Sequence, residues 1–505
     1  MKIQAIAEKY LKQAVAENSC KRGGNVIIMN PQNGDILAMA TYPDFNLNDP
    51  RNIENLGFTE ETWDELTSEE RNNKYFDLWE NRAVTRLYEP GSTYKLITTA
   101  IALEENIIGI DTPGQFYCSG SYQVADREIS CWRKEPHGTQ SLRNALCNSC
   151  NPAFMQLGQK IGANLLYKYF EAFGLFESVG SNIAKAYPGT YHELKSIGAV
   201  ELATTSFGQR FEISPLQLIT SVSAIVNDGI LINPRIVKQI ENIDTKSIDT
   251  VEVKEVRQVI SEDTSKKLKN MMQSVITEGT GRLAAVEGHS IGGKSGTSEP
   301  PIFRVSDGYT SSFIAISPIE NTQVVILVTL YDPQGGSFQG GQTAGPVISQ
   351  ILTEVLPYLG INSGQNESER ESSSLMYVSN GIGKTVAEAK SLLQQLGFNV
   401  RTNISGDENT VIVTDQTPKS GVALEKNSII YLYTEENKIK NLVSVPNIKG
   451  MSVTESKRVL RQSNLNIEVE GTNGVIVSQA PTYDTQIEEG AVIKVVIKEE
   501  LRDGQ

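Results

Sequence analysis

Three short motifs carry hydroxyl, amine and amide side chains that could together transfer an acyl group. They are Ser92-Thr-Tyr-Lys95, Ser149-Cys-Asn151 and Lys294-Ser-Gly-Thr297. A serine hydroxyl is a weak nucleophile until a neighbouring base removes its proton. Lys95 lies three residues after Ser92, so both side chains project from one side of a helix. A lysine amine becomes a base when burial and a second cation lower its pKa, and Lys294 is our candidate for that cation.

The remaining polar groups of these motifs suit the other needs of acyl transfer. Ser149 can relay protons between the lysine and a leaving amine, and Asn151 can bind the substrate backbone. If residues 294–297 form an edge strand, a peptide can add to it as a further strand. The amides of Ser92 and Thr297 would then form an oxyanion hole. We therefore predict catalytic roles for Ser92, Lys95, Ser149, Asn151 and Lys294, and binding of a substrate carboxylate by Ser295, Gly296 and Thr297, with no cofactor and no metal.

Each motif has an ordinary structural explanation, as a helix cap or a surface lysine, and only their combination is specific. One competing motif overlaps the third: residues 288–295 fit the phosphate-loop pattern GxxxxGK[ST]. That loop requires a helix directly after it. Pro300 and Pro301 argue against a helix there, so we exclude nucleotide binding.

The elements around the motifs predict an α+β domain whose sheet combines both ends of the segment. Apolar spacing indicates a helix over residues 3–17, and an apolar pattern on all sides indicates a buried helix over 92–105. Two β-hairpins are expected, at 25–41 and 309–330. A further helix should open with Pro346 at its first position and end near Gly360. The predicted fold is an antiparallel sheet with helices on both sides.

The rest of the chain divides into a linker and a tandem repeat. Residues 362–374 contain no apolar side chain and predict a flexible linker. Beyond it, GKTVAEAKSLL (383–393) matches GMSVTESKRVL (450–460), and residues 415–433 match 478–496. Each repeat indicates one amphipathic helix followed by short strands. The predicted domains are 1–361, the linker 362–375, and two small α/β modules at 376–436 and 441–499.

Composition excludes several classes of protein. The chain has 505 residues, so two to four domains are expected, and its net charge of −14 argues against nucleic-acid binding. The apolar stretch from Val324 to Leu330 is far shorter than a membrane span, and the first thirty residues contain neither a signal peptide nor a stop-transfer segment.

The five cysteines leave several interpretations open. The spacing is compatible with three interpretations. The cysteines could be free, partly buried thiols, or Cys118 and Cys131 could form a disulfide. A zinc site could also form from Cys118, Cys131, Cys147 and Cys150. Cys147 and Cys150 also form a CxxC pair that suggests a redox centre. The three histidines, His137, His192 and His289, are too scattered to indicate a metal centre.

The three motifs occur together in β-lactamases and penicillin-binding proteins. The chain resembles the class B penicillin-binding proteins in particular, the monofunctional transpeptidases of division and sporulation. Four further segments carry this resemblance, which are 30–50, 88–95, 207–217 and 278–281. The two repeats resemble PASTA modules. The resemblance covers roughly residues 20–360 and 377–498.

The resemblance implies a peptidoglycan D,D-transpeptidase. The D-Ala-D-Ala end of a stem peptide would acylate Ser92, and an amine of a neighbouring stem peptide would take the acyl group. β-Lactam antibiotics would block Ser92. Partners would include division or sporulation cell-wall proteins. The PASTA modules would bind peptidoglycan or serve as structural or docking modules.

Some expectations follow from differences between this chain and the family. Members begin with a cytoplasmic tail, a membrane helix and a pedestal domain, and none is present here. We therefore expect this chain to be part of an extracytoplasmic protein attached to the membrane through a helix outside the sequence. Ser295 stands where threonine is common and keeps the hydroxyl group. Cys118 and Cys131 resemble a redox-switched pair of sporulation-type relatives.

Two alternatives share parts of this interpretation. A β-lactamase or D,D-carboxypeptidase would use the same Ser92 chemistry but transfer the acyl group to water. A non-catalytic cell-wall sensor would keep the fold without the chemistry. The complete set of hydroxyl and amine groups favours an enzyme.

Overall fold

The computed structural model describes the chain except for residues 1, 181–184, 187, 246, 301–306, 362–375, 403, 405, 425–427, 436–439, 452, 471–474 and 499–505. The chain divides into two compact units, Met1–Ser363 and Gly364–Gln505. The predicted linker, 362–375, lies outside the described residues. Within the described part of the chain, no helix combines the length and the apolar character needed to cross a lipid bilayer.

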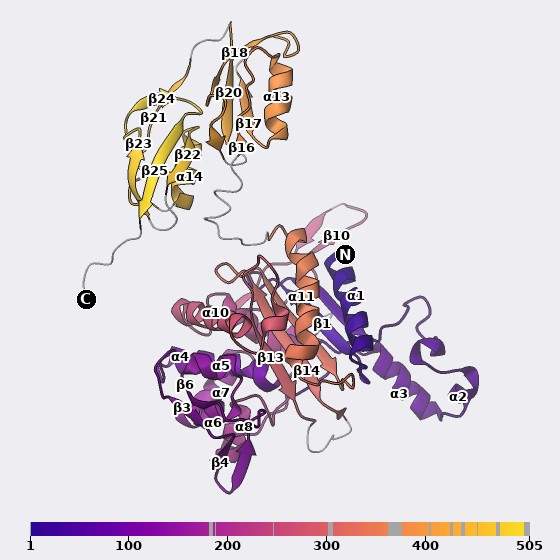
Figure 1. Ribbon diagram of the computed structural model, residues 1–505. Coiled ribbons are helices and arrows are strands. Elements are labelled where there is room, and N and C mark those ends of the chain that lie inside the picture. The colour runs from indigo at the N-terminus through magenta and orange to yellow at the C-terminus, as the bar shows by residue number, and fades with distance from the viewer. Residues whose placement is uncertain are drawn as a thin grey trace. The chain divides into compact units, whose positions relative to one another are not determined.

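The first unit is organised around a five-stranded antiparallel sheet in the order β13-β14-β15-β1-β2 (Figure 1). Its strands are β1 (Gly24–Met29), β2 (Ile36–Tyr42), β13 (Gly292–Ser298), β14 (Thr310–Ser317) and β15 (Val324–Tyr331). Both predicted hairpins are confirmed, as β1-β2 and β14-β15. The segment with the third motif is the edge strand β13, as predicted. Because residues 292–298 form a strand, the phosphate-loop alternative is excluded.

The other elements of this unit are connected around the sheet. The helices are α1 (Lys2–Glu17), α2 (Glu60–Asp64), α3 (Ser68–Trp79), α4 (Lys95–Glu104), α5 (Leu142–Cys147), α6 (Asn151–Ile161), α7 (Ala163–Ala172), α8 (Ala199–Thr205), α9 (Pro215–Val226), α10 (Glu262–Thr277) and α11 (Gly340–Tyr358), with 3₁₀ turns η1 (Ile53–Leu56), η2 (Gly91–Tyr94), η3 (Leu194–Ser196) and η4 (Arg282–Ala284). The short strands are β3 (Phe116–Cys118), β4 (Ser121–Val124), β5 (Arg127–Ser130), β6 (Gly138–Gln140), β7 (Val179–Gly180), β8 (Lys185–Ala186), β9 (Ile230–Ile232), β10 (Gln239–Glu241), β11 (Ile248–Thr250) and β12 (Glu255–Gln258).

Helices cover both faces of the sheet, because successive side chains of each strand point to opposite sides. On β1, Val26 and Ile28 pack into a core with α1 and α11, which lie side by side in Figure 1. Ile27 and Met29 pack into the other core, with residues of α4, α6, α9 and α10. The predicted α+β domain with helices on both sides of an antiparallel sheet is confirmed.

The buried central helix is also confirmed. Turn η2 continues directly into α4, and every residue from Lys95 to Leu103 is buried. A helix that is apolar on nearly all sides can be stable only in the interior. The two charged groups at its ends therefore differ in exposure, with Lys95 fully buried and Glu104 at the C-terminal end partly exposed.

The start of the last helix differs from the prediction. Helix α11 begins at Gly340, so Pro346 lies inside it rather than at its first position. The first turn packs closely against the sheet, since a Cβ on Gly340 would lie 2.1 Å from the Gly296 carbonyl oxygen. This tertiary packing holds the early turns as helix and outweighs the disruption by proline. The helix ends at Tyr358, close to Gly360 as expected.

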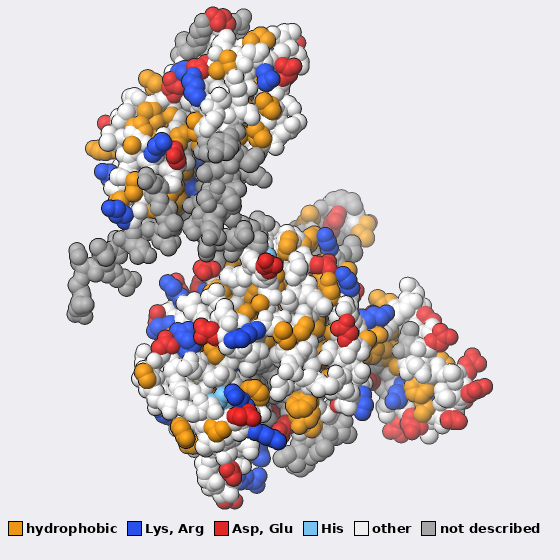
Figure 2. All heavy atoms as spheres, viewed as in Figure 1, with side chains coloured by type: hydrophobic (Ala, Val, Ile, Leu, Met, Phe, Trp, Pro, Cys, Tyr) orange, Lys and Arg blue, Asp and Glu red, His pale blue; other side chains and the backbone are white. Residues whose placement is uncertain are grey.

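An acidic arm projects from the first unit. Helices α2 and α3 both begin with capping boxes, formed by Thr59 and Thr67, and carry exposed acidic side chains. Figure 2 shows these carboxylates gathered over the arm. The segment 59–79 thus forms two short, capped helices.

The second unit contains two modules of the same design. The first has α13 (Val386–Gln395) and strands β16 (Met376–Tyr377), β17 (Asn399–Thr402), β18 (Val413–Thr417), β19 (Ala423–Leu424) and β20 (Ile429–Thr434); the second has α14 (Val453–Gln462), β21 (Leu442–Ser444), β22 (Asn466–Glu470), β23 (Val475–Ala480), β24 (Gln486–Glu488) and β25 (Val492–Lys498). In each, the last strand lies between a parallel and an antiparallel neighbour. Each module has its own apolar core, which confirms the predicted repeat.

Candidate active site

Ser92 lies in turn η2, at the start of the buried helix, and is partly exposed. The preceding Gly91 has a φ of 54°, and its N–H donates to the Gly208 carbonyl at 2.8 Å. A Cβ on Gly91 would lie 2.6 Å from the Thr297 carbonyl oxygen. Glycine therefore allows both the backbone conformation and the close approach of this turn to strand β13.

Lys95 is completely buried one turn after Ser92. Its Nζ donates to the Ser149 carbonyl at 2.7 Å, to Asn151 Oδ1 at 2.7 Å and to Ser149 Oγ at 3.3 Å. The amine also lies over the ring of Phe154, 5.2 Å from its centroid. Burial lowers the pKa of Lys95 to about 7, because the charged form loses its hydration. This lysine is therefore poised to exchange a proton near neutral pH.

Ser149 occupies a strained position between α5 and α6. Its φ is 53°, in the left-handed region that non-glycine residues rarely adopt. The next residue, Cys150, is the N-cap of α6, and Asn151 begins that helix. This sharp turn aims both the carbonyl and the hydroxyl of Ser149 at Lys95. A strained backbone conformation of this kind persists only where the surrounding packing holds it in place.

Lys294 reaches the same serine from the sheet. Its Nζ donates to Ser149 Oγ at 3.0 Å and to the Ser295 carbonyl at 2.9 Å. Burial, and then repulsion by the Lys95 ammonium, holds the pKa of Lys294 well below its usual range. Lys294 therefore lies close to Lys95 as predicted, but burial, and not this second amine, lowers the pKa of Lys95. The repulsion between the two amines acts on Lys294 instead.

The rest of the third motif is held by neighbouring segments. Ser295 Oγ lies 3.0 Å from Thr280 Oγ1, and Thr297 Oγ1 accepts a hydrogen bond from the Gly340 N–H at 3.1 Å. A Cβ on Gly296 would lie 2.5 Å from Ser312 Oγ and 2.8 Å from a Thr93 methyl carbon. Glycine at 296 therefore permits the strand to pack against the turn that carries Ser92.

The three motifs meet at one cavity of about 850 Å³, which we call the groove. Its lining from the motifs consists of Ser92, Ser149, Asn151, Ser295 and Thr297. Residues 127–132 line another part of it. Lys95 and Lys294 do not line the groove themselves, but both donate hydrogen bonds to Ser149, which does. Gly296 lies between the lining residues Ser295 and Thr297. The structure thus brings all the predicted site residues together in or beside one groove.

Sequence reasoning assigned no role to several residues that support this site. Thr280 contacts Ser295, and the Gly208 carbonyl holds the turn before Ser92. Both lie in segments whose resemblance to the family was noted, 278–281 and 207–217, so a signal for their importance existed. The Phe207 ring, 6.0 Å from Lys95 Nζ, belongs to the same segment. Burial also raises the pKa of Glu89 to about 7, three residues before Ser92.

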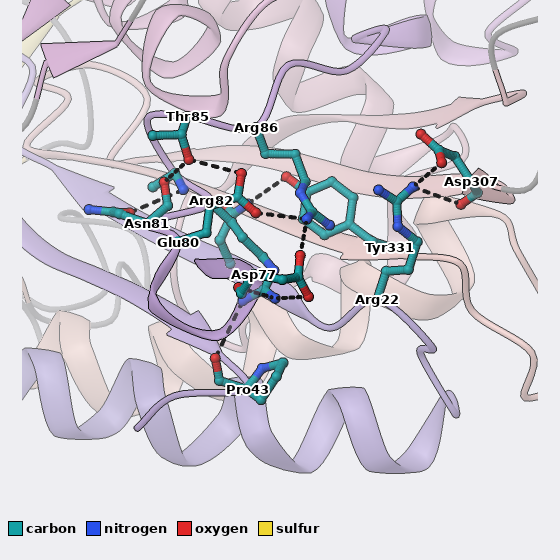
Figure 3. A network of polar contacts seen from close by, with 12 residues as sticks. Arg22, Pro43, Asp77, Glu80, Asn81, Arg82, Thr85, Arg86, Asp307 and Tyr331 are labelled. Atoms are coloured by element: carbon teal, nitrogen blue, oxygen red, sulfur yellow. Dashed lines mark hydrogen bonds and ion pairs between the residues drawn. The ribbon is translucent and has the colours of Figure 1, made fainter. Parts of the chain in front are cut away.

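A polar network anchors the segment that leads to Ser92 (Figure 3). Arg82 is buried and donates to the Asp77 carbonyl at 3.1 Å and to the Pro43 carbonyl at 3.4 Å. Arg86 binds Glu80 at 2.7 Å and stacks over the Tyr331 ring of the sheet. These contacts tie α3 and the following loop to β2 and β15.

The cysteines agree with the interpretation as free thiols, but their grouping in space differs from the four-cysteine set that the spacing suggested. All five are free thiols in this structure and all are buried. Cys118, Cys131 and Cys150 gather around His137, with their ligand atoms and the imidazole within 4.8 Å of one another. Cys147 is not part of this group. The three histidines are too scattered in the sequence to indicate a metal centre, and the position of His137 among three thiols was not predicted from it.

Comparisons with known proteins agree with the fold and the motifs. The family model described as the penicillin binding protein transpeptidase domain matches residues 24–353, and the PASTA domain model matches residues 376–436 and 443–499. The chain is 34% identical over 448 residues to stage V sporulation protein D of Bacillus subtilis (strain 168), which covers 86% of this chain and 64% of that protein. It is 27% identical over 364 residues to the probable peptidoglycan D,D-transpeptidase PenA of Neisseria flavescens, covering 72% and 82%.

Solved structures show the same architecture. The transpeptidase domain of penicillin-binding protein 3 from Burkholderia pseudomallei superposes with a TM-score of 0.57 at 25% identity, covering 72% of this chain and 96% of that one. A D,D-transpeptidase domain from Eggerthella lenta gives a TM-score of 0.60 at 25% identity, covering 72% and 82%. This chain spans a little less than two thirds of the Bacillus relative.

Proposed function

This chain belongs to the penicillin-binding protein transpeptidase family, and we propose that it is a serine D,D-transpeptidase that cross-links the stem peptides of peptidoglycan. The observation that carries this proposal is the convergence of Ser92, Ser149 and the edge strand β13 on one groove, with two buried amines of lowered pKa behind Ser149. The open edge of β13 and the side chain of Asn151 further support binding of an extended peptide.

The donor peptide would bind along β13. An edge strand offers unpaired N–H and C=O groups to an extended peptide. The hydroxyls of Ser295 and Thr297 would bind the terminal carboxylate of D-Ala-D-Ala. The anion would in turn favour the protonated form of Lys294, whose pKa is otherwise held low. Asn151 Oδ1 accepts from Lys95, which leaves the NH₂ group of this side chain to donate to the substrate backbone.

Acylation would begin with attack of Ser92 Oγ on the carbonyl carbon of the penultimate D-Ala. The hydroxyl proton passes to the neutral amine of Lys95. The backbone N–H groups of Ser92 and Thr297 stabilise the oxyanion, an effect typically worth about 10²–10³ in rate for each donor. The bond to the terminal D-Ala then breaks, and its nitrogen takes a proton relayed by Ser149.

The second half of the reaction would use the same groups in reverse. An amine of a neighbouring stem peptide attacks the ester at Ser92 and loses a proton toward Lys95. The ester C–O bond breaks, and Ser92 regains its proton. A β-lactam would acylate Ser92 in the same way, but its leaving nitrogen stays tethered, so the adduct persists.

We further propose that the chain acts on the outer side of the cell membrane, where peptidoglycan is assembled. The PASTA modules would bind peptidoglycan or a cell-wall partner of division or sporulation. The relatives include a stage V sporulation protein, which supports the sporulation setting.

The test is the reaction of the full chain with penicillin, followed by intact-mass spectrometry. Wild-type protein should gain one long-lived adduct, and Ser92→Ala should gain none. Ser261→Ala is the matched control, because Ser261 also lies at a helix N-terminus but does not line the groove, and it should keep the adduct. An adduct on Ser92→Ala would identify another nucleophile, and folded wild-type protein without an adduct would indicate a sensor.

Turnover separates the transpeptidase from a hydrolase. Rapid conversion of penicillin to penicilloate would contradict the proposal and indicate a β-lactamase. With a peptide ending in D-Ala-D-Ala and an acceptor amine, D-Ala release should be matched by an amide product. Release matched by the free acid alone would indicate a carboxypeptidase.

A further inference from the structure

Three cysteines and one histidine from four separate segments converge beside the groove. Cys118 ends β3, Cys131 follows β5, His137 precedes β6, and Cys150 caps α6. Their ligand atoms all lie within 4.8 Å of one another. Pairing of β3 with β6 places Cys118 opposite Gly138, and the Cys131 N–H donates to the Gly120 carbonyl at 2.8 Å. The backbone thus holds the group together without a covalent link.

The distances can be compared with those of a tetrahedral zinc site. Zinc binds cysteine sulfur at about 2.3 Å and histidine nitrogen at about 2.0–2.1 Å. Across a tetrahedral angle, a sulfur and a nitrogen ligand are then about 3.6 Å apart. The Nδ1 atom of His137 lies 3.6 Å from Cys118 Sγ and 3.6 Å from Cys131 Sγ. Both distances equal the tetrahedral value.

The donor set and its burial favour a structural site. The thiols of Cys118 and Cys150 are inaccessible to solvent, and Cys131 is 8% exposed. Three thiolates and one imidazole complete four-coordinate zinc and leave no position for a substrate. Soft sulfur ligands select zinc over magnesium or calcium.

We propose that Cys118, Cys131, His137 and Cys150 bind one structural Zn²⁺ ion through three thiolates and the His137 Nδ1 atom. Binding converts three thiols to thiolates and releases three protons, with no change in oxidation state. This set differs from the four cysteines whose spacing suggested a zinc site, because His137 replaces Cys147.

The position of this site gives it a second role, which rests on the proposed transpeptidation. Cys150 is the central residue of the Ser149-Cys-Asn151 motif. A metal bound to Cys150 would hold the strained turn at Ser149 in place through the adjacent residue. Cys131 lies in segment 127–132 of the groove lining, where the Trp132 indole N–H donates to the Asn148 carbonyl at 3.0 Å. The metal would thus connect this lining to the catalytic turn.

Metal content tests the site directly. Full-length protein purified under reducing conditions should contain about one zinc per chain by plasma mass spectrometry. After exchange with Co²⁺, it should show intense sulfur-to-cobalt charge-transfer absorption and the visible bands of tetrahedral cobalt. Cys118→Ser and His137→Ala should lose stoichiometric metal. Cys147→Ser and Cys20→Ser, which replace buried thiols outside the group, should retain it.

The wild-type measurement decides the question even if a ligand variant fails to fold. Reduced wild-type protein that holds neither zinc nor cobalt would overturn the site. So would metal-free protein with two thiols fewer than its five cysteines, because that count indicates a disulfide. The positioning role is tested separately: removal of the metal by a chelator should slow acylation by penicillin at least about tenfold. Unchanged acylation of metal-free protein would overturn that role and leave both the zinc site and the transpeptidase proposal standing.

Discussion

Lys95 and Lys294 bring their side-chain nitrogens to one hydroxyl oxygen, at 3.3 Å and 3.0 Å from Ser149 Oγ. Two ammonium groups this close and this deeply buried repel each other, so one of them loses its proton readily. When one amine is neutral, Ser149 can accept from the charged lysine and donate to the neutral one. A proton can thus cross between the two lysines through a single hydroxyl.

The pKa of Lys95 predicts how acylation depends on pH. Burial lowers this pKa to about 7, and the amine must be neutral to accept the Ser92 proton. The rate constant for acylation by penicillin should therefore rise as pH increases through about 7 and level off above it. Stopped-flow measurement with a fluorescent penicillin, over a range from about pH 5 to about pH 9, checks this.

Glu89 provides the control for this profile, because its pKa is also raised to about 7. Glu89→Gln removes that titration, and its amide oxygen can still accept the hydrogen bond from the Arg210 N–H. The variant should keep the inflection of the wild-type profile. If the inflection disappears in Glu89→Gln, the rate reports on Glu89 and not on Lys95.

Ser149→Ala should slow acylation by about 10²–10⁴-fold, the usual contribution of a positioned proton-transfer group. Lys95 keeps its bonds to the Ser149 carbonyl and to Asn151, so the groove should remain folded. Ser265→Ala is a suitable control, because Ser265 is also buried, lies outside the groove lining, and its hydroxyl has no hydrogen-bond partner among the described residues. Wild-type acylation by Ser149→Ala would mean that the proton does not pass through this hydroxyl.

Much of the site could be predicted because its elements have strong local patterns. The helix after Ser92 is apolar on nearly all sides, which is typical of a buried helix. The strands β14 and β15 are long apolar runs separated by a turn, and the third motif precedes them as an edge strand. These patterns suffice to place Ser92 and Lys294 on a helix and a strand of one core.

The features that were missed depend on contacts between distant segments. The start of α11 is set by the close approach of Gly340 to β13, which no local pattern reveals. His137 joins Cys118 through strands β3 and β6, each of three residues, too short to show a periodicity. Cysteine spacing alone therefore suggested Cys147 as a possible fourth ligand, although its sulfur is not among the gathered ligand atoms.

Arg82→Ala should lower the free energy of unfolding of the first unit by about 2–4 kcal/mol. The Arg82 side chain is 1% exposed, and its loss leaves a cavity and two carbonyl groups, of Pro43 and Asp77, without this donor. Tryptophan fluorescence during denaturant unfolding of the full chain measures the change. All three tryptophans, Trp63, Trp79 and Trp132, lie in the first unit, so the signal reports on that unit alone.

The matched control is Arg133→Ala, at an ion pair with Glu135 in which both side chains are largely exposed. Exposed pairs contribute little, so this change should stay within about 0.5 kcal/mol. Similar effects of the two substitutions would contradict an anchoring role for Arg82 and would assign the stability of the segment to its apolar contacts.

The packing of α11 against the groove leads to a prediction with an internal control. A Cβ on Gly340 would lie 2.1 Å from the Gly296 carbonyl oxygen and 2.2 Å from that of Ser312, both backbone atoms that cannot rotate away. Gly340→Ala should therefore push the start of α11 away from β13 and destabilise the first unit by about 1–3 kcal/mol. The shift also disturbs the hydrogen bond to Thr297 Oγ1, so acylation by penicillin should fall at least about tenfold.

Gly345→Ala in the same helix should have the opposite effect on stability. The nearest atom to a Cβ at this position is 3.6 Å away, an ordinary contact. Replacing a helical glycine with alanine then stabilises by up to about 1 kcal/mol, since the unfolded chain loses conformational freedom. Tryptophan fluorescence and the acylation rate, measured on both variants, separate the two cases. If Gly340→Ala acylates as fast as Gly345→Ala, then the approach of α11 to β13 does not position Thr297 for the reaction.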